Sequence, residues 1–370
     1  MIYLDNAATT KMNETLLDVI KDFSCERFYN ASAGYSFALS NSKSLNEARE
    51  TILKKLGANK GDVIFTGSAT EANNLAIKGS IREGKWQYIF SIGEHPSVYN
   101  VAKEMQESGR EVKFISLQKN GQVDYIELEE FVNEKTRFVS IMLVNNETGS
   151  LNDIAKISKI VKSKNPAAII HVDAVQGFCK IPFSLQKWDI DLLSISAHKF
   201  HGPKGVAALY VKNKNSLKSI MAGGGQEFGL RSGTENLPAI MAMSKCCQGV
   251  DVEKNYEKVL NLRSVFLSNI DLKRVSYVKT ESPYICSLSF EGVNGETLMR
   301  ALENEVVIGT GSACSTKKSG NRVLEAMGFD AKYIKSSVRV SFNAYQTEEE
   351  VRKAANIIMK TYEELYERLK

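Results

Sequence analysis

The chain has 370 residues, of which 43% are hydrophobic and 25% are charged, and its formal net charge is +5. These proportions lie close to the globular average and exclude a disordered or fibrous protein. No apolar run reaches the roughly 18 residues that a membrane-spanning helix requires, and the first residues have neither the basic nor the apolar region of a signal peptide. We therefore expect a cytoplasmic globular protein of two or three domains, with no membrane partner.

The six cysteines form no CxxC pair, so the sequence predicts neither a disulfide framework nor a zinc or other metal site. The mild positive charge suits anionic small molecules or an acidic protein partner. Basic residues gather in 201–225 and 314–339, but no aromatic interleaving marks a surface that stacks nucleic-acid bases. We interpret both runs as a positive rim around a site and expect no direct nucleic-acid partner.

Apolar residues spaced by three and four predict a helix over 45–56, which Gly57 ends. Short apolar segments then alternate with helical patterns as far as residue 170. This alternation is typical of an α/β fold with a mainly parallel sheet covered by helices on both faces. The predicted strands are 63–65, 88–90, 112–117, 138–144 and 168–170. One predicted helix follows the turn 66–71, a second begins at Pro96, and two more cover 128–132 and 154–161.

The pattern changes after about residue 250. A long charged helical stretch comes first, then apolar strands over 285–290 and 338–342, and a closing helix from Thr347. These elements predict a smaller α+β domain. We expect a large domain over 15–255 and a small domain that combines 1–14 with 256–370.

Polar residues that packing does not require follow several of the predicted strands, where ligands bind in sheets of this kind. The small-residue turn Thr66–Glu71 leads into a helix whose free N–H groups suit a phosphate, although Ser68 or Thr70 could equally be a plain helix cap. His95 follows the next strand and could also be a capping residue. Both interpretations stay open at each position.

Two further strands end in charged residues. Asp173 ends one strand, and Lys199 follows the next. A lysine at a buried strand end is costly unless it is paired or used. An acid, a lysine and a phosphate-type turn are the set that pyridoxal phosphate needs, because lysine forms the Schiff base and the acid holds the pyridinium nitrogen protonated.

Four motifs carry a resemblance to a known family. They are Asn145–Gly149, Ser196–Lys199 with Gly202–Gly205, Arg231–Thr234 and Gly311–Cys314. In this order and spacing they resemble the cysteine desulfurases of the class V aminotransferase group, the NifS/IscS-like enzymes, over nearly the whole chain. The resemblance implies the fold type I of pyridoxal phosphate-dependent transferases, with a mainly parallel seven-stranded sheet in the large domain.

The resemblance also implies pyridoxal 5′-phosphate as the cofactor. Lys199 would carry it as a Schiff base, Asp173 would hydrogen-bond the ring nitrogen, and Gln176 would hydrogen-bond the phenolic oxygen. His95 would stack on the ring and shuttle protons, a role that suits an imidazole with a pKa near neutrality. The other implied cofactor-binding residues are Ala69 and, at the phosphate, Thr70, Ser196 and His198, joined by Thr234 from the other subunit of a homodimer.

For the reaction, the resemblance implies that Asn146 and Arg339 hold the α-carboxylate of L-cysteine. Cys314 is the implied nucleophile, whose thiolate takes the substrate's sulfur as a persulfide while L-alanine is released. Its neighbours are small residues and two lysines, Lys317 and Lys318, which favour an exposed loop and a lowered thiol pKa. The sulfur would pass to an acceptor protein, either an iron–sulfur scaffold or a tRNA-thiolation enzyme.

Three alternatives remain beside this interpretation. A selenocysteine lyase or another β-lyase would use the same cofactor. An aminotransferase would need no thiol in the glycine-containing segment 309–320. An inactive sulfur-relay scaffold would be expected to lack Lys199 or Cys314, and both are present.

The sequence departs from the family pattern at several positions. The phosphate turn reads Gly67-Ser68-Ala69-Thr70 where serine usually precedes glycine, and Tyr35 stands in place of a histidine near the expected substrate entrance or dimer contact. The segment after Cys314 is rich in lysine and slightly short, and Asn343-Ala344 replaces the usual Gly-Arg. None of these departures changes Lys199, Asp173 or Arg339.

Overall fold

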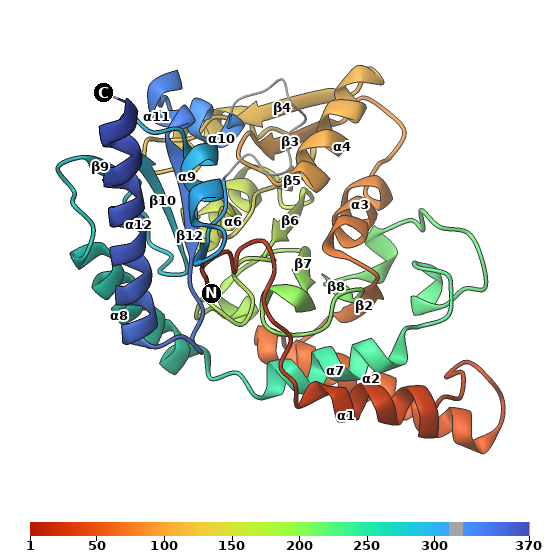
Figure 1. Cartoon of the computed structure of the whole chain (residues 1–370). Coiled ribbons are helices and arrows are strands. Elements are labelled where there is room, and N and C mark those ends of the chain that lie inside the picture. Colours follow the sequence, from red (N-terminus) through yellow and green to blue (C-terminus); the bar gives the residue numbers. More distant parts are fainter. Residues whose placement is uncertain (311–320, 370) are drawn as a thin grey trace.

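A seven-stranded sheet occupies the centre of the computed structural model, which describes residues 1–310 and 321–369 (Figure 1). Its strand order is β2-β8-β7-β6-β5-β3-β4. All strands are parallel except β8, which runs antiparallel to both of its neighbours. The strands are β2 (Asp62–Thr66), β3 (Gln87–Ser91), β4 (Glu111–Ile115), β5 (Thr136–Ser140), β6 (Ile169–Asp173), β7 (Leu192–Ser196) and β8 (Ala207–Val211).

Successive residues of these strands face opposite sides of the sheet and belong to two different hydrophobic cores. In β2, Val63 and Phe65 pack into the core that α2 (Ser36–Leu56), α6 (Ile154–Lys164) and α7 (Leu237–Gln248) cover, whereas Ile64 packs into the other. That second core is covered by α3 (Ala69–Gly79) and α4 (Pro96–Glu107). Burial on both faces explains why the strands read as continuous apolar runs.

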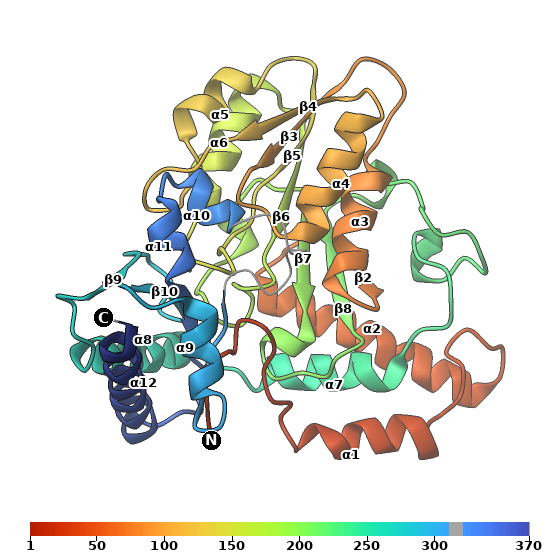
Figure 2. The same cartoon turned by 45° about the horizontal axis from the view of Figure 1, so that its top comes forward.

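The C-terminal part forms a second, antiparallel sheet in the order β12-β10-β9. Figure 2 shows this sheet grouped with α8, α9 and α12 beside the central sheet, and the N-terminal segment between the two groups. The first strand, β1, pairs in parallel with β11. These elements are β1 (Ile2–Tyr3), α8 (Val252–Ser268), β9 (Val275–Tyr277), β10 (Ile285–Phe290), α9 (Gly295–Leu302), β11 (Val306–Val307), β12 (Ser337–Ser341) and α12 (Glu348–Leu369).

The remaining helical elements are short and connect the larger ones. They are α1 (Leu16–Lys21), a π-helix (Asp22–Glu26), α5 (Tyr125–Phe131), α10 (Arg322–Ala326), α11 (Ala331–Lys335) and the 3₁₀ turns Leu185–Lys187, Ala197–Lys199, Lys214–Ser216 and Glu227–Gly229. Among the described helices, none combines the length and apolar character needed to cross a membrane.

The expected α/β class with a mainly parallel sheet is confirmed, and most predicted elements occur within a few residues of their expected bounds. The predicted strand 138–144 is wrong after Ser140, because the amide of Met142 donates to the Glu94 carboxylate and not to a backbone carbonyl of β3. Likewise β4 ends at Ile115, and α2 begins at Ser36, nine residues earlier than expected. The two predicted domain ranges remain a prediction.

Candidate functional site

Asp173 and Lys199 lie at the same end of the sheet, because they lie at the C-terminal ends of two adjacent parallel strands. β6 and β7 pair in parallel, so Asp173, the last residue of β6, lies opposite Ser194, and Lys199 follows directly after β7 in a 3₁₀ turn. The Lys199 amine donates to the backbone carbonyls of Ala7 and Ala8 at 2.7 and 2.8 Å. The N-terminal segment therefore crosses the sheet edge beside this lysine.

The Asp173 carboxylate is buried and accepts hydrogen bonds from neutral donors. The Asn73 amide donates to Oδ2 at 2.9 Å, and the backbone N–H of Val175 donates to Oδ1 at 3.0 Å. Within the described part of the chain, no ion pair includes Asp173. A buried carboxylate without a cation is costly, so this position is suited to a positively charged group.

His95 is the N-cap residue of α4, as one of its two interpretations predicted, and its ring is held by Ser97. Nδ1 lies 2.8 Å from the Ser97 hydroxyl and accepts from the Ser97 backbone N–H at 3.2 Å. Because an amide N–H can only donate, Nδ1 is an acceptor, and the neutral ring carries its proton on Nε2. Asn73 donates to the Ser97 hydroxyl as well as to Asp173, so these four side chains are connected.

The surroundings of His95 favour its neutral form. Burial lowers the pKa of the imidazole most strongly, the positive charges of Lys199 and Arg322 lower it further, and Asp173 opposes them. His95 is therefore close to both charged residues that the sequence predicted beside it. It is neutral at pH 7 and can accept or give a proton.

Gln176 follows Asp173 and lies beside Lys199. Its side-chain N–H donates to the Ala7 carbonyl at 2.8 Å, the same oxygen that accepts from Lys199, and its carbonyl oxygen accepts from Lys180 at 3.1 Å. All of these groups are in contact with the N-terminal segment or with each other.

The two chain segments that carry Thr70 and Ser196, which were predicted to bind the phosphate, lie at the same end of the sheet. Thr66 at the end of β2 and Ser196 at the end of β7 both lie opposite Ala207 of β8. Ser68 caps α3 by accepting from the Glu71 amide, and Ala69 and Thr70 form the first turn of this helix. The capping interpretation of Ser68 is therefore confirmed, and the free N–H groups of the first turn remain suited to an anion.

His198 faces the same N-terminal segment. Its Nδ1 lies 3.1 Å from the Thr9 hydroxyl, and its backbone carbonyl accepts from Thr10. Burial, together with the charges of Lys199, Lys180 and Lys204, lowers the pKa of His198 to about 4. This imidazole is therefore neutral at pH 7 and acts as a hydrogen-bonding group.

Arg339 reaches the site from the second sheet. Its guanidinium donates to the backbone carbonyl of Asn146 at 2.9 Å and to the Asp5 carboxylate at 2.8 Å, while its buried Nε has no hydrogen-bond partner among the described residues. A Cβ at Gly309 would lie 2.7 Å from the Asp5 carboxylate, so only glycine leaves room for this ion pair. An arginine with a free donor beside Asn146 suits a carboxylate ligand.

Two predicted site residues are not joined to this group. Thr234 is exposed in a loop of the single chain, three residues after Arg231, which forms an ion pair with Glu71 of α3. Cys314 lies outside the described residues, as do the neighbouring Lys317 and Lys318.

Two acids with raised pKa values, the buried Glu94 and the partly buried Glu147, were not predicted. Burial raises the pKa of Glu94 to about 8 and that of Glu147 to about 7. Arg322, at the start of α10, lies near both: its guanidinium donates to the backbone carbonyls of Ile92 and Glu94 and lies 3.9 Å from the centre of the Tyr99 ring. The only signal for Glu94 in the sequence is its place directly before His95.

Asn73 and Ser97 were also missed, although Asn73 carried a signal. It is fully buried on the apolar face of α3, between Ala72 and Leu75. A buried amide on such a face needs a polar partner, and here the partners are Ser97 and Asp173.

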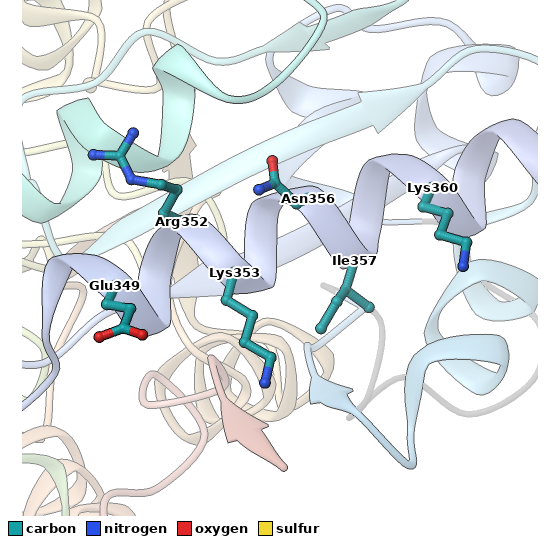
Figure 3. Close-up of a pocket in the computed structure, with 6 residues that line it drawn as sticks. All are labelled: Glu349, Arg352, Lys353, Asn356, Ile357 and Lys360. Carbon is teal, nitrogen blue, oxygen red and sulfur yellow. The ribbon is translucent and has the colours of Figure 1, made fainter.

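A hollow lies on the outer helix α12, away from the residues at the strand ends. Figure 3 shows the six residues that line it, spread along one helix: Glu349, Arg352, Lys353, Asn356, Ile357 and Lys360. Its volume is about 330 Å³ and it is open to solvent. Within residues 1–310 and 321–369, no group of three His, Cys, Asp or Glu could hold a metal ion.

The strand-end residues fit pyridoxal phosphate. Among the described residues no cation pairs with the buried Asp173 carboxylate, as expected for the partner of a pyridinium nitrogen, and the first turn of α3 offers N–H groups at the same sheet edge. The unpartnered Arg339 Nε adds a donor for a carboxylate.

Comparison with known proteins identifies the family. The family model of class V aminotransferases matches residues 2–353. A cysteine desulfurase of Nostoc sp. is 34% identical over 99% of this chain and 94% of its own length, and the cysteine desulfurase IscS of Dictyoglomus turgidum is 35% identical over 98% and 95%. Among solved structures, a NifS-like protein superposes with a TM-score of 0.91 at 33% identity over 99% of both chains. The chain belongs to the class V aminotransferase family, in its cysteine desulfurase branch.

Proposed function

We propose that this protein is a pyridoxal phosphate-dependent cysteine desulfurase, which converts L-cysteine to L-alanine and transfers the sulfur to Cys314 as a persulfide. One observation supports this most: the buried Asp173 carboxylate, which pairs with no cation in the described part of the chain, ends the strand next to the one that Lys199 follows. The similarity to curated cysteine desulfurases over almost the whole chain supports the substrate. A solved relative, SspA in complex with cysteine, superposes with a TM-score of 0.82.

In this proposal the strand-end residues hold the cofactor. Pyridoxal phosphate supplies an electron sink conjugated to the substrate's α-carbon. Lys199 holds it through the ε-amine, Asp173 keeps the ring nitrogen protonated, and Gln176 donates to the phenolic oxygen. Ala69, Thr70, Ser196 and His198 bind the phosphate, together with Thr234 from a second subunit.

Two side chains move protons. With the cofactor and L-cysteine bound, the Lys199 amine would be the base that accepts the proton of the substrate's α-carbon. His95, neutral at pH 7 with its proton on Nε2, faces the same group of charges and can exchange a proton with the substrate. Ser97 fixes the imidazole in this tautomer.

Arg339 and Asn146 orient the substrate. The α-carboxylate of cysteine binds the unpartnered Nε of Arg339, and the Asn146 side chain, three residues before Gly149, donates to the same group. The Asp5 carboxylate holds Arg339 in position from the other side.

Cys314 completes the reaction. Its thiolate attacks the substrate sulfur, the bond between carbon and sulfur breaks, and its electron pair returns to the carbon, which takes up a proton to give alanine. The persulfide then passes its outer sulfur to an acceptor protein of the iron–sulfur or tRNA-thiolation type. The free cysteines of the described chain agree with a reducing, cytoplasmic location.

The second subunit is proposed from an exposed aromatic surface. Phe28, Tyr35 and Phe37 are each about half exposed or more, and Tyr29 stacks with both phenylalanines at 4.6 and 4.9 Å. Large exposed apolar groups of this kind mark interaction sites. In Figures 1 and 2 the α1–α2 region extends from the body of the molecule, so a second copy can cover it and bring its Thr234 to the phosphate.

The test is alanine formation from L-cysteine by the protein loaded with pyridoxal phosphate. We expect alanine and reduced sulfur in equal amounts in the presence of a thiol. Lys199→Ala should abolish both products and the visible absorbance of the bound cofactor, whereas Lys353→Ala, on the exposed side of α12 (Figure 3), should keep them. Equal alanine formation by Lys199→Ala and the wild type would refute the proposal.

A further inference from the structure

Lys180 is a buried lysine that the proposed reaction does not use. It lies in the turn after β6, four residues after Gln176, and only 5% of its surface is exposed. Its amine donates to the Gln176 side-chain carbonyl at 3.1 Å and lies 5.8 Å from the centre of the Tyr284 ring. Within the described part of the chain, no acidic group forms an ion pair with it.

The charged groups around Lys180 are mainly cations. Lys199 approaches from the turn after β7, Arg339 from β12, and Cys179 is its neighbour in the chain. Burial, followed by the charges of Lys199 and Arg339, lowers the pKa of Lys180 to about 7. His198 and His201 face the same amine, and its charge contributes to lowering the pKa of each. Burying a positive charge beside other cations costs folding free energy. A methionine, which has a similar length and no charge, would avoid this cost.

What the amine contributes is the direction of the Gln176 amide. As an ammonium group Lys180 can only donate, so in this form it fixes the carbonyl oxygen of Gln176 toward itself, and the amide N–H₂ points to the opposite side. On that side Gln176 donates to the Ala7 carbonyl at 2.8 Å, and Lys199 donates to the same oxygen at 2.7 Å. A flipped amide would set two carbonyl oxygens against each other at Ala7.

We propose that Lys180 is a positioning residue, which holds the Gln176 amide so that its N–H₂ faces Lys199 and the phenolic oxygen of the cofactor. The inference rests on the proposed function, because it assigns the cofactor to Lys199. A donor to the phenolic oxygen competes with the neighbouring nitrogen of the lysine linkage for the oxygen's negative charge. Loss of this donor therefore strengthens proton binding at that nitrogen.

The test is a pH titration of the visible absorbance of the bound cofactor, without substrate. In Lys180→Met we expect the midpoint to rise by about one pH unit, a tenfold change in proton affinity. Lys180→Gln, a second neutral variant, should shift it in the same direction and covers the case in which the methionine variant does not fold. Lys162→Met is the matched control: this lysine pairs with Asp191, and its loss should leave the midpoint unchanged.

A double variant tests the route of the effect. If Lys180 acts through Gln176, then Gln176→Leu shifts the midpoint by itself, and adding Lys180→Met gives no further shift. An unchanged midpoint in both Lys180 variants would overturn the inference while leaving the proposed function intact, as would a full additional shift in the double variant. A wild-type protein that binds no pyridoxal phosphate would instead contradict the proposed function and the inference together.

Discussion

At the scale of single residues, the site depends on side chains that fix one another in position. Asn73 connects Asp173 to Ser97, and Ser97 holds Nδ1 of His95. The same arrangement occurs at Arg339, whose guanidinium is fixed between Asp5 and the Asn146 carbonyl. Groups held by such contacts keep the geometry that a reaction needs before the substrate arrives.

Gly309 gives a direct test of the Arg339 position. In Gly309→Ala the new methyl group would meet the Asp5 carboxylate at 2.7 Å and the Arg339 guanidinium at 3.1 Å. We expect KM for cysteine to rise about tenfold, equivalent to about 1.4 kcal/mol of binding free energy. Steady-state kinetics check this.

The matched control is Gly249→Ala, where a Cβ would be no nearer than 3.7 Å to any atom. Its KM should equal that of the wild type. An unchanged KM in Gly309→Ala would mean that Arg339 does not hold the substrate carboxylate.

At the scale of elements, α10 is attached to the turn that carries His95. Arg322, its first residue, donates to the carbonyls on both sides of Gly93 and contacts the Tyr99 ring of α4. This contact joins chain positions about 230 residues apart. It also places a positive charge where it lowers the pKa of His95.

Arg322→Gln should therefore change the pH dependence of the reaction. His95 is neutral above its pKa, which burial and the nearby cations hold below 6.5, so kcat/KM should fall only as the pH falls through that value. Removing the guanidinium charge raises the pKa, and the acidic limb of the profile should move to higher pH. Arg322→Lys keeps the positive charge, so the acidic limb of its pH profile should stay at the wild-type pH. If the acidic limbs of the wild type and both variants coincide, the proposed role of His95 in proton exchange is wrong.

The elements also show what could be predicted from the sequence. Asp173 and Lys199 were found because a polar residue after an apolar run marks the edge of a sheet, and the pairing of β6 with β7 confirms that they are neighbours. The carbonyls of Ala7 and Ala8 could not be found, because backbone groups carry no residue-type signal. The contact of Asp5 with Arg339 spans 334 positions and depends on how the N-terminal segment crosses the fold.

The antiparallel strand β8 was missed for a similar reason. Its sequence, Ala207–Val211, is apolar like that of the parallel strands, since it is buried on both faces. Direction within a sheet is set by the connection between strands, and a short turn after Lys199 permits an antiparallel return. The pattern of apolar residues contains no information on this point.

At the scale of the whole molecule, we expect a homodimer that forms through the aromatic surface of Phe28, Tyr29, Tyr35 and Phe37. Phe37→Glu should weaken self-association at least tenfold, because a buried unpaired charge is costly, and sedimentation should show a monomer. Cofactor occupancy should fall with it, since in the proposed function Thr234 of a second subunit binds the phosphate. Ile126→Glu, at a 72% exposed position on α5, is the control and should remain associated; a dimeric Phe37→Glu protein would contradict this interface.

The central claim is that the sulfur of cysteine arrives on Cys314. The most direct measurement is mass spectrometry of the protein after incubation with L-cysteine and no acceptor, with each cysteine-containing peptide compared before and after reduction. We expect one additional sulfur atom on the Cys314 peptide, which reductant removes; it should be absent in Lys199→Ala and absent from the peptide of the exposed Cys25. Alanine formation at the wild-type rate with no additional sulfur on Cys314 would contradict this claim.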